Sequence, residues 1–390
     1  MIAADREEHL RRTIAALERW GAERGWVGPD PYEGLSAPRL APLKRSPLGR
    51  RVLIQAVKRS PLDLRRPLGI VAGLDAATVA HVLAAHSRLP VGLRHDPDRD
   101  LGAGMDALER LRLDAFEEPC WGYHFDVETR FFNYPASTPN TIATAFAGHA
   151  LLDAHAAGAG EGALELAIGV GRFFCERVGL NRVGEGGYFG YFAGDRTPIH
   201  NASLLAGSLL ARLAEPGGPE ADRFAEAAAA TARYALAHQR ADGSWPYAEG
   251  GRGDWVDGFH TGYVLDALLA IAEALDDDEV GSAWARGLEH YSAGLFTVDG
   301  TPRYFIDRTY PIDGQSVAQA IRTFSLASRR QPERLEEAWR TYAFAVERMS
   351  RGDGAFIFQR RRLWTNRRPH VRWVQAPMLD ALAHLAEVSA

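Results

Sequence analysis

Six segments of the chain are rich in small apolar residues and carry few charges in their middles, as helices that are buried nearly all round do. They recur about every sixty residues and begin near Leu68, Thr138, Pro198, Gly258, Pro311 and His370. A repeat of this length predicts one helical unit that is used six times.

A second type of helix is expected before each of these segments. It has apolar residues at spacings of three and four and charged residues on the opposite face, which predicts a helix with one buried side. These amphipathic stretches lie in residues 6–24, 100–113, 163–178, 221–239, 280–296 and 333–350. The chain therefore alternates outer and inner helices.

The loops from outer to inner helices resemble one another. A Gly or Pro stands close to alternating aromatic residues at 120–126, 186–192, 242–247, 302–307 and 353–358. This pattern predicts short extended or hairpin segments at one end of the helices. Together the repeats predict an all-α fold, an (α/α)6 toroid or six-hairpin barrel, as a single domain over residues 1–390. A closed ring leaves no exposed solenoid ends.

Composition narrows the class of protein. The chain has 390 residues, of which 46% are hydrophobic and 24% charged, and its net charge of −5 does not favour nucleic acid. Cys120 and Cys175 form neither a disulfide framework nor a zinc-ligand pattern, which fits a reducing compartment. The N-terminus does not look like a secretory signal, and no apolar run of about eighteen residues occurs. We therefore expect a cytoplasmic protein, and the sequence predicts no metal and no cofactor.

Polar residues gather where the inner helices begin. In a toroid these helix starts face one end, so their loops should line one funnel, the default place for a ligand. Asp257 and His260 share the first turn of one inner helix and could act together as general acid or base. Asp313 and Asp126 are further candidates for proton transfer. The alternative is structural: helix capping for Asp257 and Asp313, and a backbone hydrogen bond for Asp126.

Aromatic and hydrogen-bonding residues at these junctions are candidates for binding sugar rings, because indole and phenol rings offer flat apolar faces with a polar tip. Each aromatic residue could instead belong to the core. The predicted binding residues are Trp121, Tyr123, His124, Asn140, His200, Asn201, Trp245, Tyr247, Trp255, Tyr310, Gln315, Trp364, Arg372 and Trp373. Arg372 is expected to clamp an anion, since a guanidinium binds carboxylate or phosphate through two hydrogen bonds.

The segment 44–66 holds eight Lys or Arg residues against one Asp. It predicts either an ordinary amphipathic helix between two Ser-Pro turns or a peripheral contact with an anionic membrane surface or acidic polymer. The second interpretation would suit a lipid-linked glycan.

Several motifs together resemble a family of prokaryotic proteins associated with polysaccharide biosynthesis. They are PDPYEGLSAP at 29–38, KRSPLDLRRPLGI at 58–70, CWGYHFD at 120–126, HNASLLAG at 200–207, DGSW at 242–245, VDGFHTGYVLDAL at 256–268, YPIDGQSVAQAI at 310–321 and RWVQAPML at 372–379. The resemblance spans nearly the whole chain and implies a six-hairpin toroid and a glycan context. More distantly, the architecture is similar to that of unsaturated glucuronyl hydrolases, polysaccharide lyases, sugar epimerases and terpene cyclases.

These observations favour an enzyme that hydrolyses, eliminates or epimerises a glycan, expected to be anionic, by acid/base chemistry. One alternative is a glycan-binding or scaffold protein of polysaccharide assembly that has no turnover. Another is an enzyme similar to terpene cyclases, which a mostly apolar cavity would favour. A fold supports many functions, so the site has to decide between them.

Overall fold

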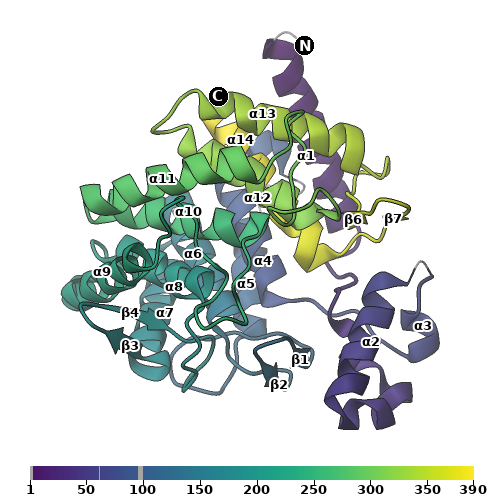
Figure 1. Ribbon diagram of the computed structural model, residues 1–390, viewed down its shortest axis with the longest axis horizontal. Coiled ribbons are helices and arrows are strands. Elements are labelled where there is room, and N and C mark those ends of the chain that lie inside the picture. The colour runs from purple at the N-terminus through teal and green to yellow at the C-terminus, as the bar shows by residue number, and fades with distance from the viewer. Residues whose placement is uncertain (1–2, 61, 95–99) are drawn as a thin grey trace.

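The structure is a computed structural model that describes residues 3–60, 62–94 and 100–390. Its centre is a ring of inner helices: α4 (Ala76–Arg88), α6 (Thr141–Ala154), α8 (His200–Leu213), α10 (Gly258–Ala274), α12 (Gly314–Ala327) and α14 (Ala376–Ser389). Each inner helix packs against the next, and α14 packs against α4, so the ring closes (Figure 1). The predicted all-α toroid is confirmed.

The outer helices are α1 (Ala3–Ala22), α5 (Asp100–Leu111), α7 (Glu161–Arg172), α9 (Ala221–Ala237), α11 (Asp278–Gly294) and α13 (Arg334–Phe344). Helix α1 packs on α14, and each of the others packs on the inner helix that precedes it. Their amphipathic pattern explains this layer: in α1, Leu10, Ile14 and Leu17 are buried, while Arg11 and Arg12 are exposed.

Small residues let the helices approach closely. A Cβ atom added at Gly148 of α6 would lie 2.4 Å from the side chain of Leu209 on α8. One added at Gly207 of α8 would lie 2.0 Å from the hydroxyl of Thr231 on α9. Contacts this short leave no room for a methyl group, so the apolar, small-residue character of the inner helices follows from the spacing of the ring.

Strands are short and lie in the loops. They are β1 (Val127–Glu128) with β2 (Asn133–Tyr134), β3 (Leu180–Val183) with β4 (Gly186–Phe189), and the sheet of β5 (Ile312–Asp313), β6 (Gln359–Arg360) and β7 (Thr365–Asn366), all antiparallel. Short 3-10 turns are η1 (Glu33–Ser36), η2 (Pro38–Arg45), η3 (Val91–Leu93) and η6 (Gly218–Glu220). The π turns are η4 (His155–Ala159), η5 (Phe173–Val178), η7 (Ala345–Met349) and η8 (Val371–Gln375).

The first inner helix begins later than the start predicted near Leu68. That residue ends a separate short helix, α3 (Arg65–Leu68), which is followed by Gly69 in the left-handed conformation at φ 74°. Glycine takes this conformation without a steric penalty and so commonly ends helices. Helix α4 starts only after Asp75, whose carboxylate accepts a hydrogen bond from the N–H of Ala77 at 2.9 Å.

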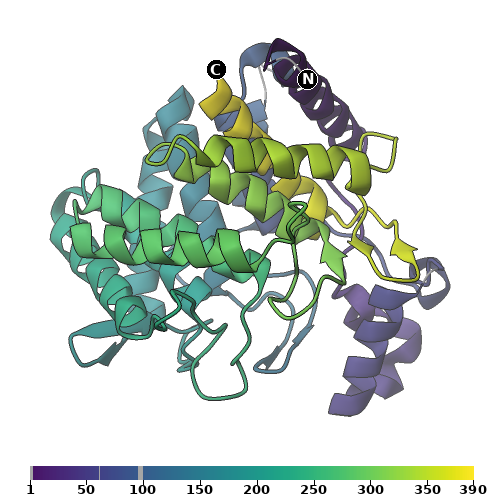
Figure 2. The same ribbon diagram turned by 45° about the horizontal axis from the view of Figure 1, so that its top comes forward.

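The basic segment forms an excursion beside the ring. Helix α2 (Pro47–Arg59) packs on η1 through a small cluster that includes Leu35, Leu53 and Ile54. Figures 1 and 2 show α2 and α3 set to one side of the helical ring. Within the described ranges, no helix is both long and apolar enough to cross a membrane.

Candidate active site

The starts of the inner helices are tied to one another by a repeated backbone hydrogen bond. The first N–H of an inner helix donates to an aromatic residue in the loop that precedes the next inner helix. These bonds are Thr141 to Tyr191 at 2.8 Å, His200 to Tyr247 at 3.3 Å, Gly258 to Tyr304 at 2.9 Å and Gly314 to Phe358 at 2.8 Å. The aromatic loops therefore lie at one shared end of the ring, as the sequence predicted.

Asp257 and His260 form a close pair at this end. His260 Nδ1 lies 2.6 Å from Asp257 Oδ2, and the Nε1–H of Trp255 donates to the same oxygen at 3.0 Å. Asp257 is buried, whereas the side chain of His260 keeps 21% of its surface exposed. A carboxylate accepts hydrogen bonds, so Nδ1 is the protonated nitrogen, and Nε2 of the neutral imidazole carries a lone pair.

The same carboxylate also caps helix α10. Asp257 Oδ1 accepts a hydrogen bond from the backbone N–H of His260 at 3.0 Å. Helix capping and acid/base action together with His260 were the alternatives predicted for Asp257, and the contacts that each requires use different oxygen atoms. One residue therefore does both, and the cap fixes the carboxylate that holds the histidine.

A second imidazole–carboxylate pair lies beside the first. His200 Nε2 is 2.7 Å from Glu249 Oε1. Burial lowers the pKa of His200, and the hydrogen bond from His200 lowers the pKa of Glu249. His200 and His260 line the same small cavity of about 10 Å³, room for about one water molecule. The buried Oδ1 of Asn201, which also lines it, has no hydrogen-bond partner in the structure.

Aromatic rings surround the histidine pair. The rings of Tyr247 and Trp255 stack at 4.7 Å with an interplanar angle of 10°, and His260 lies 4.5 Å from Tyr247. Phe131, from the loop between β1 and β2, contacts both Tyr247 and Trp255. Phe259 packs edge-to-face on Trp373 at 5.4 Å. Besides Asp257 and His260, this end thus brings together five predicted binding residues, His200, Asn201, Tyr247, Trp255 and Trp373.

Asp313 is buried in a hydrogen-bonded setting. It caps α12 by accepting from the N–H of Gln315 at 2.9 Å, and it accepts from Gln359 at 2.5 Å and from Trp373 at 3.1 Å. Burial raises its pKa, and these hydrogen bonds oppose the rise. The amide of Gln315 donates to the hydroxyl of Tyr263 at 2.6 Å. Asp313 is thus a structural anchor between three loops.

Several predicted binding residues hold the fold instead. Trp121 and Trp245 are buried, and their indole N–H groups donate to Leu108 O and Ala235 O, each at 2.8 Å. Asn140 caps α6. Asp126, a predicted proton-transfer residue, accepts from the N–H of Ala136 at 3.0 Å, which is the structural alternative considered for it.

Three further predicted residues lie away from the histidine pair or pack differently. Tyr310 and Trp364 are 44% and 38% exposed, and Trp364 has the guanidinium of Arg361 over its ring. His124 lies 3.6 Å from Asp75 and contacts Phe125.

Arg372 points inward, but its charge already has a partner. Asp30 accepts two hydrogen bonds from its guanidinium, at 2.6 and 3.0 Å, and the guanidinium lies over the ring of Tyr123 at 4.7 Å. Burial disfavours the charge, but Asp30 outweighs it and raises the pKa of Arg372 well above its usual value. The prediction that Arg372 binds an anionic ligand is therefore corrected: the carboxylate of Asp30 occupies the guanidinium.

Residues 30–33 were not among the predicted site residues. Tyr32 packs 5.7 Å from Trp373, and the ammonium of Lys58 lies over Tyr32 at 4.9 Å. Glu33 is fully buried, and neither of its carboxylate oxygens has a hydrogen-bond partner in the structure. Burial raises its pKa to about 7. The motif at 29–38 was the only signal in the sequence that could have identified these residues. They were missed because the motif lies outside the long helices, so no helical pattern marked Asp30, Tyr32 and Glu33.

Comparison with known proteins supports the architecture. No protein-family model matches the chain, and no curated protein matches it. Among solved structures, the GH76 alpha-mannanase BT2949 of Bacteroides thetaiotaomicron is similar with a TM-score of 0.62 and 13% identity, over 92% of this chain and 98% of that one. Cellobiose 2-epimerase of Bacillus thermoamylovorans gives 0.61 and 13%, over 82% and 90%.

A third similar structure is an unsaturated glucuronyl hydrolase variant with dGlcA-Glc-Rha-Glc, at a TM-score of 0.63 and 16% identity, over 95% of this chain and 94% of that one. All three identities are low, so the likeness shows the (α/α)6 toroid and no activity.

Proposed function

We propose that the protein is a carbohydrate-active enzyme that transfers protons at the amino-terminal end of its inner helices. The observation that carries the proposal is the 2.6 Å contact between His260 Nδ1 and Asp257 Oδ2, with the imidazole partly exposed. Asp257 fixes the tautomer and stabilises the imidazolium that forms when Nε2 takes a proton, as the acid of a catalytic triad does. The similar solved structures include a mannanase and a cellobiose epimerase, which supports a sugar as substrate.

Among reactions on sugars, this geometry favours epimerisation or elimination over hydrolysis. Two-carboxylate hydrolysis needs one carboxylate that acts as nucleophile or activates water. Both oxygens of Asp257 and of Asp313 accept hydrogen bonds from the protein, so neither carboxylate is free for that role. Two imidazoles, His260 and His200, line one cavity, an arrangement that suits removal of a proton by one and delivery by another.

The walls favour a sugar over a polyene. His200 and Asn201 place polar atoms in this cavity that an apolar substrate would leave unpaired. Because Asp30 neutralises Arg372, the proposal includes no preference for an anionic glycan. The proposal does include a role in polysaccharide biosynthesis, which rests on the resemblance of the motifs at 29–38, 256–268 and 372–379.

Solvent isotope exchange tests the proposed chemistry. The protein is incubated in D2O with a panel of neutral and acidic oligosaccharides, and mass spectrometry follows deuterium uptake, while absorbance follows unsaturated products. We expect uptake or elimination with the native protein and none with His260→Gln. The matched control is His155→Gln, a partly exposed histidine directly after α6. Binding without exchange in every protein would show the alternative, a glycan-binding protein without turnover.

We further propose that α2 docks on an anionic lipid surface. Leu43, Leu48 and Val52 are 45%, 73% and 53% exposed on this excursion, next to the exposed Arg45 and Arg51. Aliphatic side chains beside cations fit a bilayer interface, whereas an acidic polymer would leave the aliphatic groups unused.

Vesicle sedimentation tests this contact. The protein should pellet with phosphatidylserine-containing vesicles and not with neutral phosphatidylcholine vesicles, and Leu48→Glu should abolish pelleting. The control is Val298→Glu, which changes an exposed valine in the loop after α11, outside the segment that contains α2. Equal pelleting with both vesicle types would overturn the proposal.

A further inference from the structure

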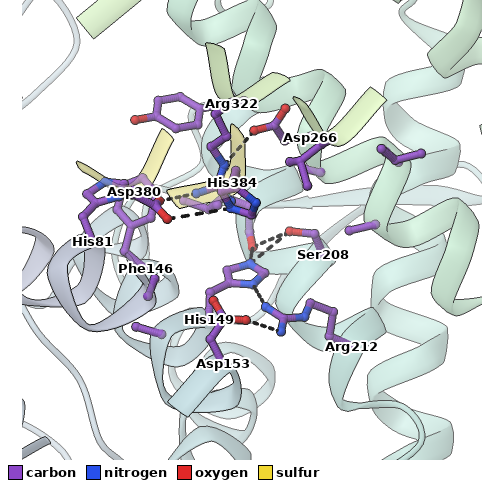
Figure 3. Close-up of a pocket in the computed structure, with 18 of the residues that line it drawn as sticks. His81, Phe146, His149, Asp153, Ser208, Arg212, Asp266, Arg322, Asp380 and His384 are labelled. Atoms are coloured by element: carbon purple, nitrogen blue, oxygen red, sulfur yellow. Dashed lines mark hydrogen bonds and ion pairs between the residues drawn. The ribbon is translucent and has the colours of Figure 1, made fainter. Parts of the chain in front are cut away.

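A second cavity lies at the opposite end of the ring, and it is much larger than the one beside His260. Its volume is about 390 Å³, within the range of about 300–1,000 Å³ that small-molecule sites occupy. Its walls come from the middle and carboxyl-terminal halves of all six inner helices (Figure 3). None of its lining residues was predicted as a site residue, because they lie inside helices rather than at loop junctions.

Tyr263 separates the two hollow regions. Its hydroxyl accepts a hydrogen bond from Gln315, at the amino-terminal start of α12. Its ring lies 5.6 Å from Phe146, which lines the large cavity, and 6.2 Å from Phe259, which faces the loops. The large cavity is therefore a separate site and not the lower part of the histidine site.

One side of this cavity is an ion network around Arg322. Its guanidinium contacts Asp266 at 3.0 Å and also pairs with Asp380. His81 lies 3.0 Å from the same oxygen of Asp380. Burial would raise the pKa of Asp380, but Arg322 outweighs it and holds that pKa well below its usual range. Asp380 is therefore an ionised acceptor and not an acid.

The other side is an ion network around Asp153. It accepts from Arg88 at 2.8 Å and from Arg212 at 2.7 Å. Arg212 also donates to His149 Nδ1 at 2.9 Å, and an arginine can only donate, so His149 carries its proton on Nε2. Burial and the charge of Arg212 lower the pKa of His149 to about 3. This histidine therefore stays neutral. Figure 3 shows it between Ser208 and Arg212.

The charges of these networks balance. Arg88, Arg212 and Arg322 face Asp153, Asp266 and Asp380, and at the rim Arg329 pairs with Glu387 and Arg330 with Glu273. The site therefore favours neither an anion nor a cation. Each guanidinium has five N–H donors, and Arg88, Arg212 and Arg322 each donate two hydrogen bonds to the described residues, so donors remain for the oxygen atoms of a ligand.

Such networks are not needed to close a helical ring. Replacing buried ion pairs with apolar residues is often neutral or stabilising, so they argue for a role other than stability. The rest of the wall is mostly apolar, with alanines of α4, α6 and α10, leucines and the rings of Phe146 and Tyr263. His384 also lines it, and neither of its buried ring nitrogens has a hydrogen-bond partner in the structure, so the imidazole is available to a hydroxyl group. Neutral charge, paired donors and acceptors, and flat apolar faces together match a molecule that has many hydroxyl groups and no charge.

We propose that this cavity is a binding site for a neutral polyhydroxylated small molecule, a monosaccharide, disaccharide or polyol. Its hydroxyls would accept from the arginines and donate to the aspartates, and one ring face would lie on Phe146 or Tyr263. No proton transfer is assigned to it, because its acids are held ionised or paired by arginine. The proposal does not depend on the activity proposed at His260.

Titration calorimetry and ligand-observed NMR test it with glucose, mannose and galactose, against glucuronic acid and glucosamine. At least one neutral sugar should bind better than both charged ones. Ala270→Phe places a ring in the cavity and should weaken binding by about tenfold or more. If Ala270→Phe does not fold, Ala274→Trp gives the same test, because Ala274 lines the cavity at an exposed position. Ala293→Phe, exposed on α11, is the matched control and should bind normally.

The His260→Gln protein separates the two sites. Binding that survives in His260→Gln and is lost in Ala270→Phe supports the cavity. Binding that is lost in His260→Gln and kept in both cavity variants places the sugar at the other end and overturns the proposal. No binding of any neutral sugar, or tighter binding of glucuronic acid or glucosamine, overturns it as well.

Discussion

The two ends of this ring are built from the same six helices but hold different chemistry. At the amino-terminal end, loops bring aromatic rings, and acids such as Asp257 and Asp313 cap the helices. At the carboxyl-terminal end, no aromatic loops intervene, and arginines such as Arg88 and Arg212 sit in the last turns of α4 and α8. This distribution follows the helix dipole, which favours acids at the start and cations at the end.

The difference teaches how burial decides what an ionisable group can do. At the carboxyl-terminal end each buried charge needs a partner, so acids and arginines lock into pairs such as Arg322 with Asp266. At the amino-terminal end Asp257 is satisfied by backbone, indole and imidazole hydrogen bonds, which leaves one nitrogen of His260 unused by the protein. This difference is why we propose ligand binding at the carboxyl-terminal end and proton transfer at the amino-terminal end.

The largest expected effect is on turnover at His260. His260→Gln should lower the rate of solvent exchange or elimination by about 10²–10⁴-fold, the usual contribution of a general acid or base. The free energy of unfolding should change little, because the side chain is partly exposed. Cavity variants such as Ala270→Phe should keep the rate of any reaction at His260. Equal rates in His260→Gln and the native protein would show that His260 does not transfer protons, and the proposed difference between the two ends would fail.

The next effect is on stability at the other end. Asp380→Asn should lower the free energy of unfolding by about 3–5 kcal/mol, because it leaves Arg322 without one of its two buried partners. Urea denaturation measures the change. Asp254→Asn is the control, an exposed acid whose pair with Arg240 should contribute about 0–1 kcal/mol. A loss in Asp380→Asn no greater than in the control would show that water already screens the network.

The sequence predicted the ring and one end of it better than the other. Period and amphipathicity gave the inner and outer helices, because burial imposes those patterns on every repeat. Junction residues such as Asp257 and His260 were visible because they break an apolar pattern at a helix start. Asp266, Arg322 and Asp380 were not recognised, since single charges within long apolar helices look like solvated positions until the ring places them face to face.

Two other features needed the folded chain. The partner of Arg372 is Asp30, which is distant in sequence, so no local pattern could reveal that the clamp was occupied. The start of α4 depended on Gly69, whose left-handed conformation divides an apolar run that read as continuous. The first is a consequence of tertiary packing, whereas the second follows from two local signals, Gly69 after α3 and the Asp75 cap of α4, that the apolar pattern hid.

A third prediction concerns Glu33, a buried acid that lies 3.8 Å from the guanidinium of Arg65 and accepts no hydrogen bond in the structure. Its pKa of about 7 in the folded protein exceeds the usual 4.5, so between these values the unfolded chain loses its proton first. The contribution of Glu33 to stability is therefore full below about pH 4.5 and is lost as the pH rises through about 7, by about 3 kcal/mol in total.

Glu33→Gln should remove this loss, so its advantage over the native protein should grow from about pH 4.5 upward and be complete above about pH 7. Urea denaturation at several pH values measures the difference between the two proteins. Glu161→Gln, at an exposed carboxyl in the first turn of α7, should show no such dependence. A constant difference at all pH values would mean that Glu33 is ionised in the folded state.

The smallest expected effect tests how Asp257 is held. Trp255→Phe keeps an aromatic ring on Tyr247 but removes the indole N–H that donates to Asp257 Oδ2 at 3.0 Å. One hydrogen bond to a carboxylate contributes about 1.5–3 kcal/mol at most, and Asp257 keeps its cap and its imidazole. We therefore expect kcat/KM to fall by about three- to tenfold, measured against Trp364→Phe, an exposed control. In an Asp257→Asn background the same change should have no further effect, because coupled groups are not additive. Additive losses in the double variant would show that Trp255 acts on the substrate directly, as a wall of the site, and not through the carboxylate that orients His260.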